Sequence, residues 1–142
     1  MPYSWNGRAA DTPERIGEIW KQLVITQPDY EPDKECVVVI ILNTRFTPIG
    51  WNRVSVGTVN ESHVHPREVL RPVIAAAGHG FVMIHNHPSG EPSPSRSDEQ
   101  ITRRMIEASN IMQIRMVDHL IFGKPAVGRS DYYSFREAGI IP

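Results

Sequence analysis

Two histidines separated by one residue, His85 and His87, are the side chains of this sequence best suited to hold a metal ion. They follow a short apolar segment, and residues two positions apart on a β-strand point to the same side. Both imidazoles therefore reach toward one point, and neutral imidazole is the commonest metal ligand in proteins. Asp98 falls in or just before the first turn of an expected helix, whose free amide groups favour an anion. We predict a metal site with His85, His87 and Asp98 as its ligands.

This ligand set is typical of a catalytic zinc site. Two nitrogens and one oxygen leave the fourth tetrahedral position open, whereas structural zinc sites are closed by four protein ligands. The only cysteine, Cys36, excludes zinc-finger clusters and the His/Cys/Cys site of zinc deaminases. Prolines between His87 and Asp98 restrict the connecting loop and lower the entropy lost in organising the site. We expect one zinc ion per chain.

Two further residues would complete a hydrolytic site. Zinc lowers the pKa of a bound water to about 7, and that water needs a general base outside the ligand set. Glu35, just before the apolar run 36–42, is the candidate base, and a solvated charge beside Lys34 is the alternative. Ser95, three residues before Asp98, is the candidate donor to an oxyanion on the substrate carbonyl. Ser-x-x-Asp is also an ordinary helix start, and the two roles are compatible.

Hydrophobic periodicity predicts the elements that must position these residues. The expected helices cover residues 12–26, 66–77, 95–110 and 134–139, with Ser95 or Ser97 as the cap of the third and a Ser134–Glu137 capping box opening the last. The expected strands cover residues 36–42, 47–58, 81–84 and 114–122, with residues 132–133 as a candidate last strand. Pro72 should kink the second helix or shift its start. The order predicts one α/β domain with a mixed sheet.

Three strand features carry specific expectations. The run 36–42 is continuous, β-branched and short, which indicates a strand buried on both faces at the centre of the sheet. In the next strand we expect a bulge at Gly50. Apolar residues alternate along 114–122 with Asp118 in the same phase, which places a carboxylate on an apolar face. A buried carboxylate must be paired, so Asp118 either bonds a ligand imidazole or satisfies backbone amides.

Composition bounds the class of protein. The 142 residues, 40% hydrophobic and 22% charged, indicate one globular domain, which we place at residues 12–142 after a flexible lead-in at 1–11. The longest apolar run, 36–42, is far shorter than the roughly 20 residues of a membrane span, and no secretory signal is visible, so we expect a cytoplasmic protein. The net charge of -1 and the scattered basic residues give no support to direct nucleic-acid binding.

The spacing of His85, His87, Ser95 and Asp98 matches the JAMM motif of the JAB/MPN metallohydrolases. The fuller string HNHPSGEPSPSRSD, with VHPREV before it and DHLI and YSFRE after it, resembles the RadC branch of that superfamily over about residues 34–140. The resemblance implies a JAB/MPN fold, a curved mixed sheet flanked by helices and related to cytidine deaminases, with zinc on the three predicted ligands. It also implies that Glu35 corresponds to the family's catalytic glutamate and Ser95 to its oxyanion serine.

Two functions from different classes follow. The first is a zinc-dependent hydrolase of amide, peptide or isopeptide bonds, in which Glu35 activates the zinc-bound water and the substrate is an unidentified peptide or protein. The second is an accessory metal-binding protein of DNA-processing machinery, suggested by the family's historical association with DNA repair. Longer RadC-like proteins carry a helix-hairpin-helix domain upstream, and we expect none here because only one helix and a connector fit.

A second His-x-His pair, His63 and His65, has the spacing of the ligand pair but no matching carboxylate nearby. We interpret His65-Pro66-Arg67 as the start of a helix and Arg67 as a cation at the rim of the active site.

Overall fold

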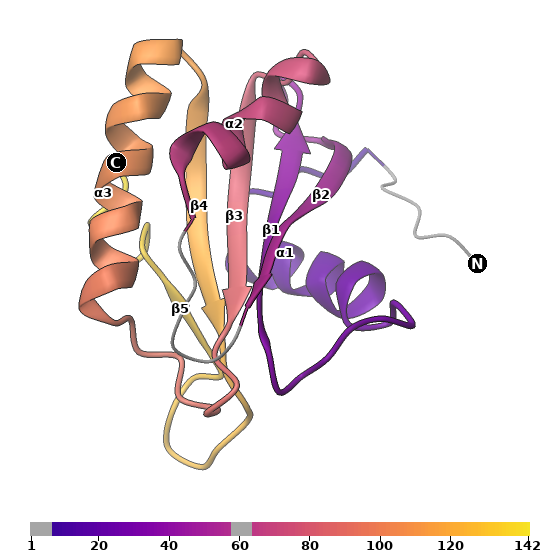
Figure 1. The fold of residues 1–142 in the computed structure, drawn as a ribbon, viewed down its shortest axis with the longest axis vertical. Coiled ribbons are helices and arrows are strands. Elements are labelled where there is room, and N and C mark those ends of the chain that lie inside the picture. Colours follow the sequence, from indigo (N-terminus) through magenta and orange to yellow (C-terminus); the bar gives the residue numbers. More distant parts are fainter. Residues whose placement is uncertain (1–6, 58–63) are drawn as a thin grey trace.

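A computed structural model describes residues 7–57 and 64–142 of the chain, and Figure 1 shows its arrangement. The described elements are, in chain order, α1 (Pro13–Ile19), a π-helical turn η1 (Trp20–Val24), β1 (Glu35–Leu42), β2 (Pro48–Gly57), α2 (Pro66–Ala75), β3 (Gly80–Asn86), α3 (Arg96–Met112), β4 (Arg115–Phe122) and β5 (Tyr132–Ser134). The five strands form one sheet in the order β2-β1-β3-β4-β5, in which only the β3–β4 pair is parallel. The predicted α/β fold with a mixed sheet is confirmed.

The sheet is covered on both faces. One hydrophobic cluster joins α1 and η1 to residues such as Val38, Ile40 and Leu120, and the other joins α2 and α3 to residues such as Val39 and Met83. Successive residues of β1 alternate between the two clusters, as a pleated strand requires. Figure 1 shows α2 lying across the sheet and α3 running alongside β4. No helix among the described residues is long and apolar enough to cross a membrane.

β1 is buried along its whole length, as its β-branched run predicts, and it pairs with both β2 and β3. It is nevertheless not the middle strand, which is β3. The expectation of a central 36–42 strand is therefore wrong in position and right in burial, because apolar composition reports neighbours on both faces but not the number of strands beyond them. The central strand is the one that ends at the predicted ligands.

Bulges change the phase of two strands. In β2 the register to β1 skips Ile49, next to the predicted bulge at Gly50, and skips Val54. In β4 the register to β3 skips Val117, so Met116 and His119 lie on the same face of the sheet. The predicted single alternating face of 114–122 is wrong for this reason, since Met116 packs on the α3 side whereas Leu120 packs on the α1 side.

The two remaining helix predictions have different outcomes. α2 starts at Pro66, as the sequence indicates, and continues through Pro72 to Ala75, so Pro72 does not shift its start, and a kink at Pro72 stays a prediction. The expected last helix is a hydrogen-bonded turn, in which the Glu137 amide donates to the Ser134 hydroxyl (3.0 Å) before the positive φ of Gly139 ends it. At the other end, Ala10 is only 1% exposed, so the packed domain includes the end of the predicted lead-in.

Candidate metal centre

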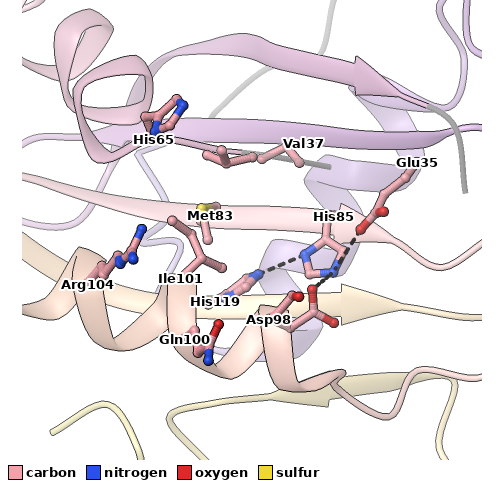
Figure 2. A pocket seen from close by; sticks show the side chains of 12 residues that line it. Glu35, Val37, His65, Met83, His85, Asp98, Gln100, Ile101, Arg104 and His119 are labelled. Atoms are coloured by element: carbon pink, nitrogen blue, oxygen red, sulfur yellow. Dashed lines mark hydrogen bonds and ion pairs between the residues drawn. The ribbon is translucent and has the colours of Figure 1, made fainter. Parts of the chain in front are cut away.

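Three strands and one helix deliver the candidate residues to the same face of the sheet. Glu35 opens β1, His85 lies near the end of β3, and His119 lies in β4, all on the α2/α3 side. His87 follows β3, and its backbone N–H donates to the Phe122 carbonyl (2.8 Å), which extends the pairing with β4. Figure 2 shows Glu35 and Asp98 pointing toward the ring of His85 from opposite elements.

The two predicted histidine ligands converge through their Nε2 atoms, which are 3.2 Å apart. Asp98 meets both rings, with Oδ1 3.3 Å from Nε2 of His85 and Oδ2 3.0 Å from Nε2 of His87. Oε1 of Glu35 lies 3.4 Å from the same His85 nitrogen. One ligand atom from each of the four residues falls within 4.8 Å of the others. The structure thus brings together the three predicted ligands and the predicted base.

A capping box at the start of α3 fixes the Asp98 carboxylate. The Ser95 N–H donates to Oδ2 of Asp98 (2.9 Å), and the Asp98 N–H donates to the Ser95 hydroxyl oxygen (3.0 Å). The box holds the carboxylate in place at the helix end where an anion is favoured. The hydroxyl oxygen of Ser95 acts here as an acceptor, which matches the helix-start interpretation and leaves its own proton for another partner.

Asn86, which separates the two histidines, fixes the position of Glu35. Its side-chain oxygen accepts from the Cys36 N–H (2.7 Å), and its side-chain nitrogen donates to the Lys34 carbonyl (3.0 Å). These two groups belong to the residues on either side of Glu35. The amide side chain therefore clamps the backbone that carries the candidate base, and it does so on the opposite side of β3 from the ligands.

A chain of hydrogen bonds determines which nitrogen of His85 carries the proton. The Thr102 hydroxyl donates to the Asp98 carbonyl (2.8 Å), so its oxygen accepts from Nδ1–H of His119 (2.7 Å). Burial and the neighbouring His85 hold the pKa of His119 well below its usual value, so its ring is neutral and Nε2 is an acceptor. Nδ1–H of His85 donates to that Nε2 (2.8 Å), which leaves Nε2 of His85 with a lone pair.

His87 is oriented by the main chain of the following loop. Its Nδ1 lies 2.8 Å from the Glu91 carbonyl oxygen, which accepts hydrogen bonds only, so Nδ1 carries a proton. In the neutral ring Nε2 then presents a lone pair, as it does in His85. Two lone pairs and two carboxylates facing one point form a set of acceptors that a cation would satisfy, and nitrogen and oxygen ligands of this kind suit zinc. The residues present therefore fit a bound divalent metal.

Two ionisation shifts follow from this crowding. Burial alone would raise the pKa of Asp98, but the adjacent His85 and His87 rings outweigh burial and hold the pKa well below its usual value, because a protonated Nε2 in the metal-free protein donates to the carboxylate. Burial would lower the pKa of His87, but its bonds to Asp98 and the Glu91 carbonyl outweigh burial and raise it. A proton on His87 is thus the natural competitor of a metal ion.

Asp118 takes the second of its two predicted roles. Its carboxylate accepts from the backbone N–H of His119 (2.7 Å), from that of Arg136 (3.0 Å) and from the Ser134 hydroxyl (2.6 Å). Burial still raises its pKa, because these bonds offset only part of the desolvation. The residue that contacts a ligand imidazole is His119, whose role the sequence did not reveal. The available signal in the sequence was a histidine in β4, the strand that pairs with the ligand strand β3.

A pocket of about 210 Å³ opens beside the metal group. His65 and Ser97 line it, whereas Ser95 and the predicted rim cation Arg67 are not among its lining residues. His65 also precedes α2 as its N-cap, which agrees with the predicted helix start. His63, the other half of the second pair, lies outside the described residues.

Comparisons with known proteins show the family of this chain. A family model described as the RadC-like JAB domain matches residues 11–140. A UPF0758 protein of Thermotoga maritima is 41% identical over 127 residues, which cover 89% of this chain and 55% of that protein. A UPF0758 protein of Symbiobacterium thermophilum is 45% identical over 103 residues (72% and 42%), and one of Chlorobium chlorochromatii is 37% identical over 125 residues (88% and 53%). The chain spans about half the length of these curated relatives.

Proposed function

The chain belongs to the RadC-like JAB domain family, and we propose that it is a metal-dependent hydrolase of amide bonds in peptides or isopeptides. The observation that carries the proposal is the convergence of Glu35, His85, His87 and Asp98 within 4.8 Å. Two neutral imidazoles and two carboxylates at the end of a pocket form the donor set of a hydrolytic metal site.

His85, His87 and Asp98 would hold one zinc ion per chain. The ion would supply a Lewis acid and lower the pKa of a water to about 7. The hydrogen-bond partners of the three ligands support this assignment, because His119, the Glu91 carbonyl and the Ser95 amide orient them from outside.

Glu35 is the general base of the proposal. Its carboxylate is nearly buried, at 6% exposure, and lies beside the ligand cluster. It accepts a proton from the attacking water and returns it to the nitrogen of the leaving amine. Ser95 donates its hydroxyl proton to the carbonyl oxygen as negative charge develops there. Each proton therefore has a named acceptor in the chain or in the substrate.

The test is activity profiling of zinc-loaded wild-type protein and Glu35→Gln on peptide and isopeptide libraries. We expect hydrolysis by wild type and a loss of about 100-fold or more in Glu35→Gln, because the glutamine amide takes up no proton. Equal activity of the two proteins would remove Glu35 from the mechanism. No hydrolysis by zinc-loaded wild type would favour the accessory metal-binding role.

A further inference from the structure

The pocket beside the metal group changes its chemistry along its length. At one end lie the carboxylates of Glu35 and Asp98, and Figure 2 shows Arg104 and His65 at the other end, away from them. The basic end attracts an anion. A ligand that spans this pocket therefore meets the metal group at one end and the Arg104 cation at the other.

The middle of the pocket is apolar. Val37 of β1, Met83 of β3 and Ile101 of α3 line it between the two charged ends. Val37 and Met83 belong to the buried core of this face, so the floor of the pocket is part of the packed core. An apolar side chain of a ligand would be removed from water in this middle part of the pocket, which favours its binding.

The spacing along α3 sets the distance between the two ends. Asp98, Ile101 and Arg104 follow one another at intervals of three residues on one side of the helix. Six residues of helix advance by about 9 Å, and two extended peptide residues span about 7 Å. A carbonyl at the metal group is therefore about two residues away from a group that Arg104 can reach with its long side chain.

We propose that this pocket selects substrates that carry a carboxylate about two residues from the scissile amide, with an apolar side chain between them. The inference rests on the proposed function and names its substrate class. The Arg104 guanidinium binds the carboxylate. A guanidinium can donate two parallel hydrogen bonds to the two carboxylate oxygens, which a lysine ammonium cannot do in the same geometry. Within residues 7–57 and 64–142, no carboxylate forms an ion pair with Arg104.

The probe is acetyl-leucyl-glycine, compared with its C-terminal amide. Calorimetry on zinc-loaded Glu35→Gln protein measures binding without turnover. We expect the acid to bind about tenfold more tightly than the amide, the size of one charge-assisted contact near the surface. Adding Arg104→Gln should bring this ratio to about one, and Arg104→Lys should retain part of it.

Arg103→Gln is the matched control, since it removes the same charge from the next position of α3 and Arg103 does not line the pocket. It should leave the acid preference unchanged. A preference that survives Arg104→Gln overturns the proposal, because the carboxylate then binds elsewhere, and so does a ratio near one in the parent protein. Library hydrolysis without an Arg104-dependent preference overturns this inference alone. Acid binding through Arg104 without any hydrolysis overturns the proposed function alone.

Discussion

The two histidines of the metal group present the same ring nitrogen but are held in opposite ways. His85 is 3% exposed and donates to His119, which is itself fully buried and bonded to Thr102. His87 has 17% of its side chain exposed and bonds to the carbonyl of Glu91 in a loop. One ligand is thus fixed by packed side chains of the core, and the other by the main chain of a surface segment.

The loop has its own supports, which come from the segment after β4. The Lys124 N–H and the Arg129 guanidinium both donate to the Gly90 carbonyl (2.8 and 2.9 Å). Gly123 lets this carbonyl approach closely, because a Cβ there would clash with it. Loops open more readily than core strands, so we infer that His85 is the pre-organised ligand and His87 the adjustable one.

The largest effect should come from breaking the buried support of His85. His119→Phe keeps a ring in the core but removes the acceptor for Nδ1–H of His85, so the imidazole loses its fixed tautomer. Zinc affinity, measured by competition with a chelator, should fall about 10- to 100-fold.

His119→Gln is the matched variant for that experiment, because its side-chain oxygen accepts the same hydrogen bond. It should recover part of the lost affinity. Equal zinc affinity in His119→Phe and wild type would show that the buried chain of hydrogen bonds does not orient the ligand.

We expect zinc affinity to depend on pH because of His87, the more exposed of the two histidine ligands. In metal-free protein the raised pKa of His87 keeps its proton to a higher pH, and zinc must displace that proton. Affinity should therefore fall about tenfold for each pH unit below the raised pKa and level off above it. Zinc titrations between about pH 6 and pH 9 measure this. A constant affinity over that range would mean that His87 is not protonated in competition with the metal.

Asn86→Ala separates the candidate base from the ligands. The change removes the two hydrogen bonds that hold the residues on either side of Glu35. The side chains of His85 and His87 point to the opposite side of the strand, so we expect them to keep their positions. Turnover should fall about fivefold through misplacement of the carboxylate, with zinc affinity nearly unchanged. A loss of zinc affinity as large as the loss of turnover would instead mean that the substitution disturbs β3 and its histidine ligands.

The smallest effect should come from the loop. Arg129→Gln removes a partly exposed ion pair to Glu91 (3.2 Å) and the hydrogen bonds of the guanidinium to the carbonyls of Gly90, Lys124 and Ser130. Exposed pairs contribute little, so zinc affinity should fall only about two- to threefold. A loss as large as that of His119→Phe would overturn the contrast between the two ligands.

The sequence predictions that agree with the structure rest on patterns within a few neighbouring residues. The His-x-His pair and the Ser95–Asp98 capping box are short-range features, and they place three of the four clustered residues without knowledge of strand order. The buried run of β1 is equally local. Glu35 joins them because it adjoins that run, although its role in catalysis stays a prediction.

The features that the sequence did not reveal depend on strand pairing. Asn86 bonds to Cys36 across 50 positions, and His119 bonds to His85 across 34. The bulge at Val117, which brings Met116 and His119 onto one face, appears only when β4 is paired with β3. Alternation in one segment says which residues share a face only while the pleat is regular.

The most direct measurement of the central claim is the zinc content of purified wild type, His87→Ala and Glu35→Gln by mass spectrometry of the metal. If His87 is a ligand and Glu35 acts outside the ligand set, wild type and Glu35→Gln should each hold close to one zinc per chain, and His87→Ala should lose it. Metal-free wild type, or zinc fully retained in His87→Ala, would contradict the assignment of the metal centre.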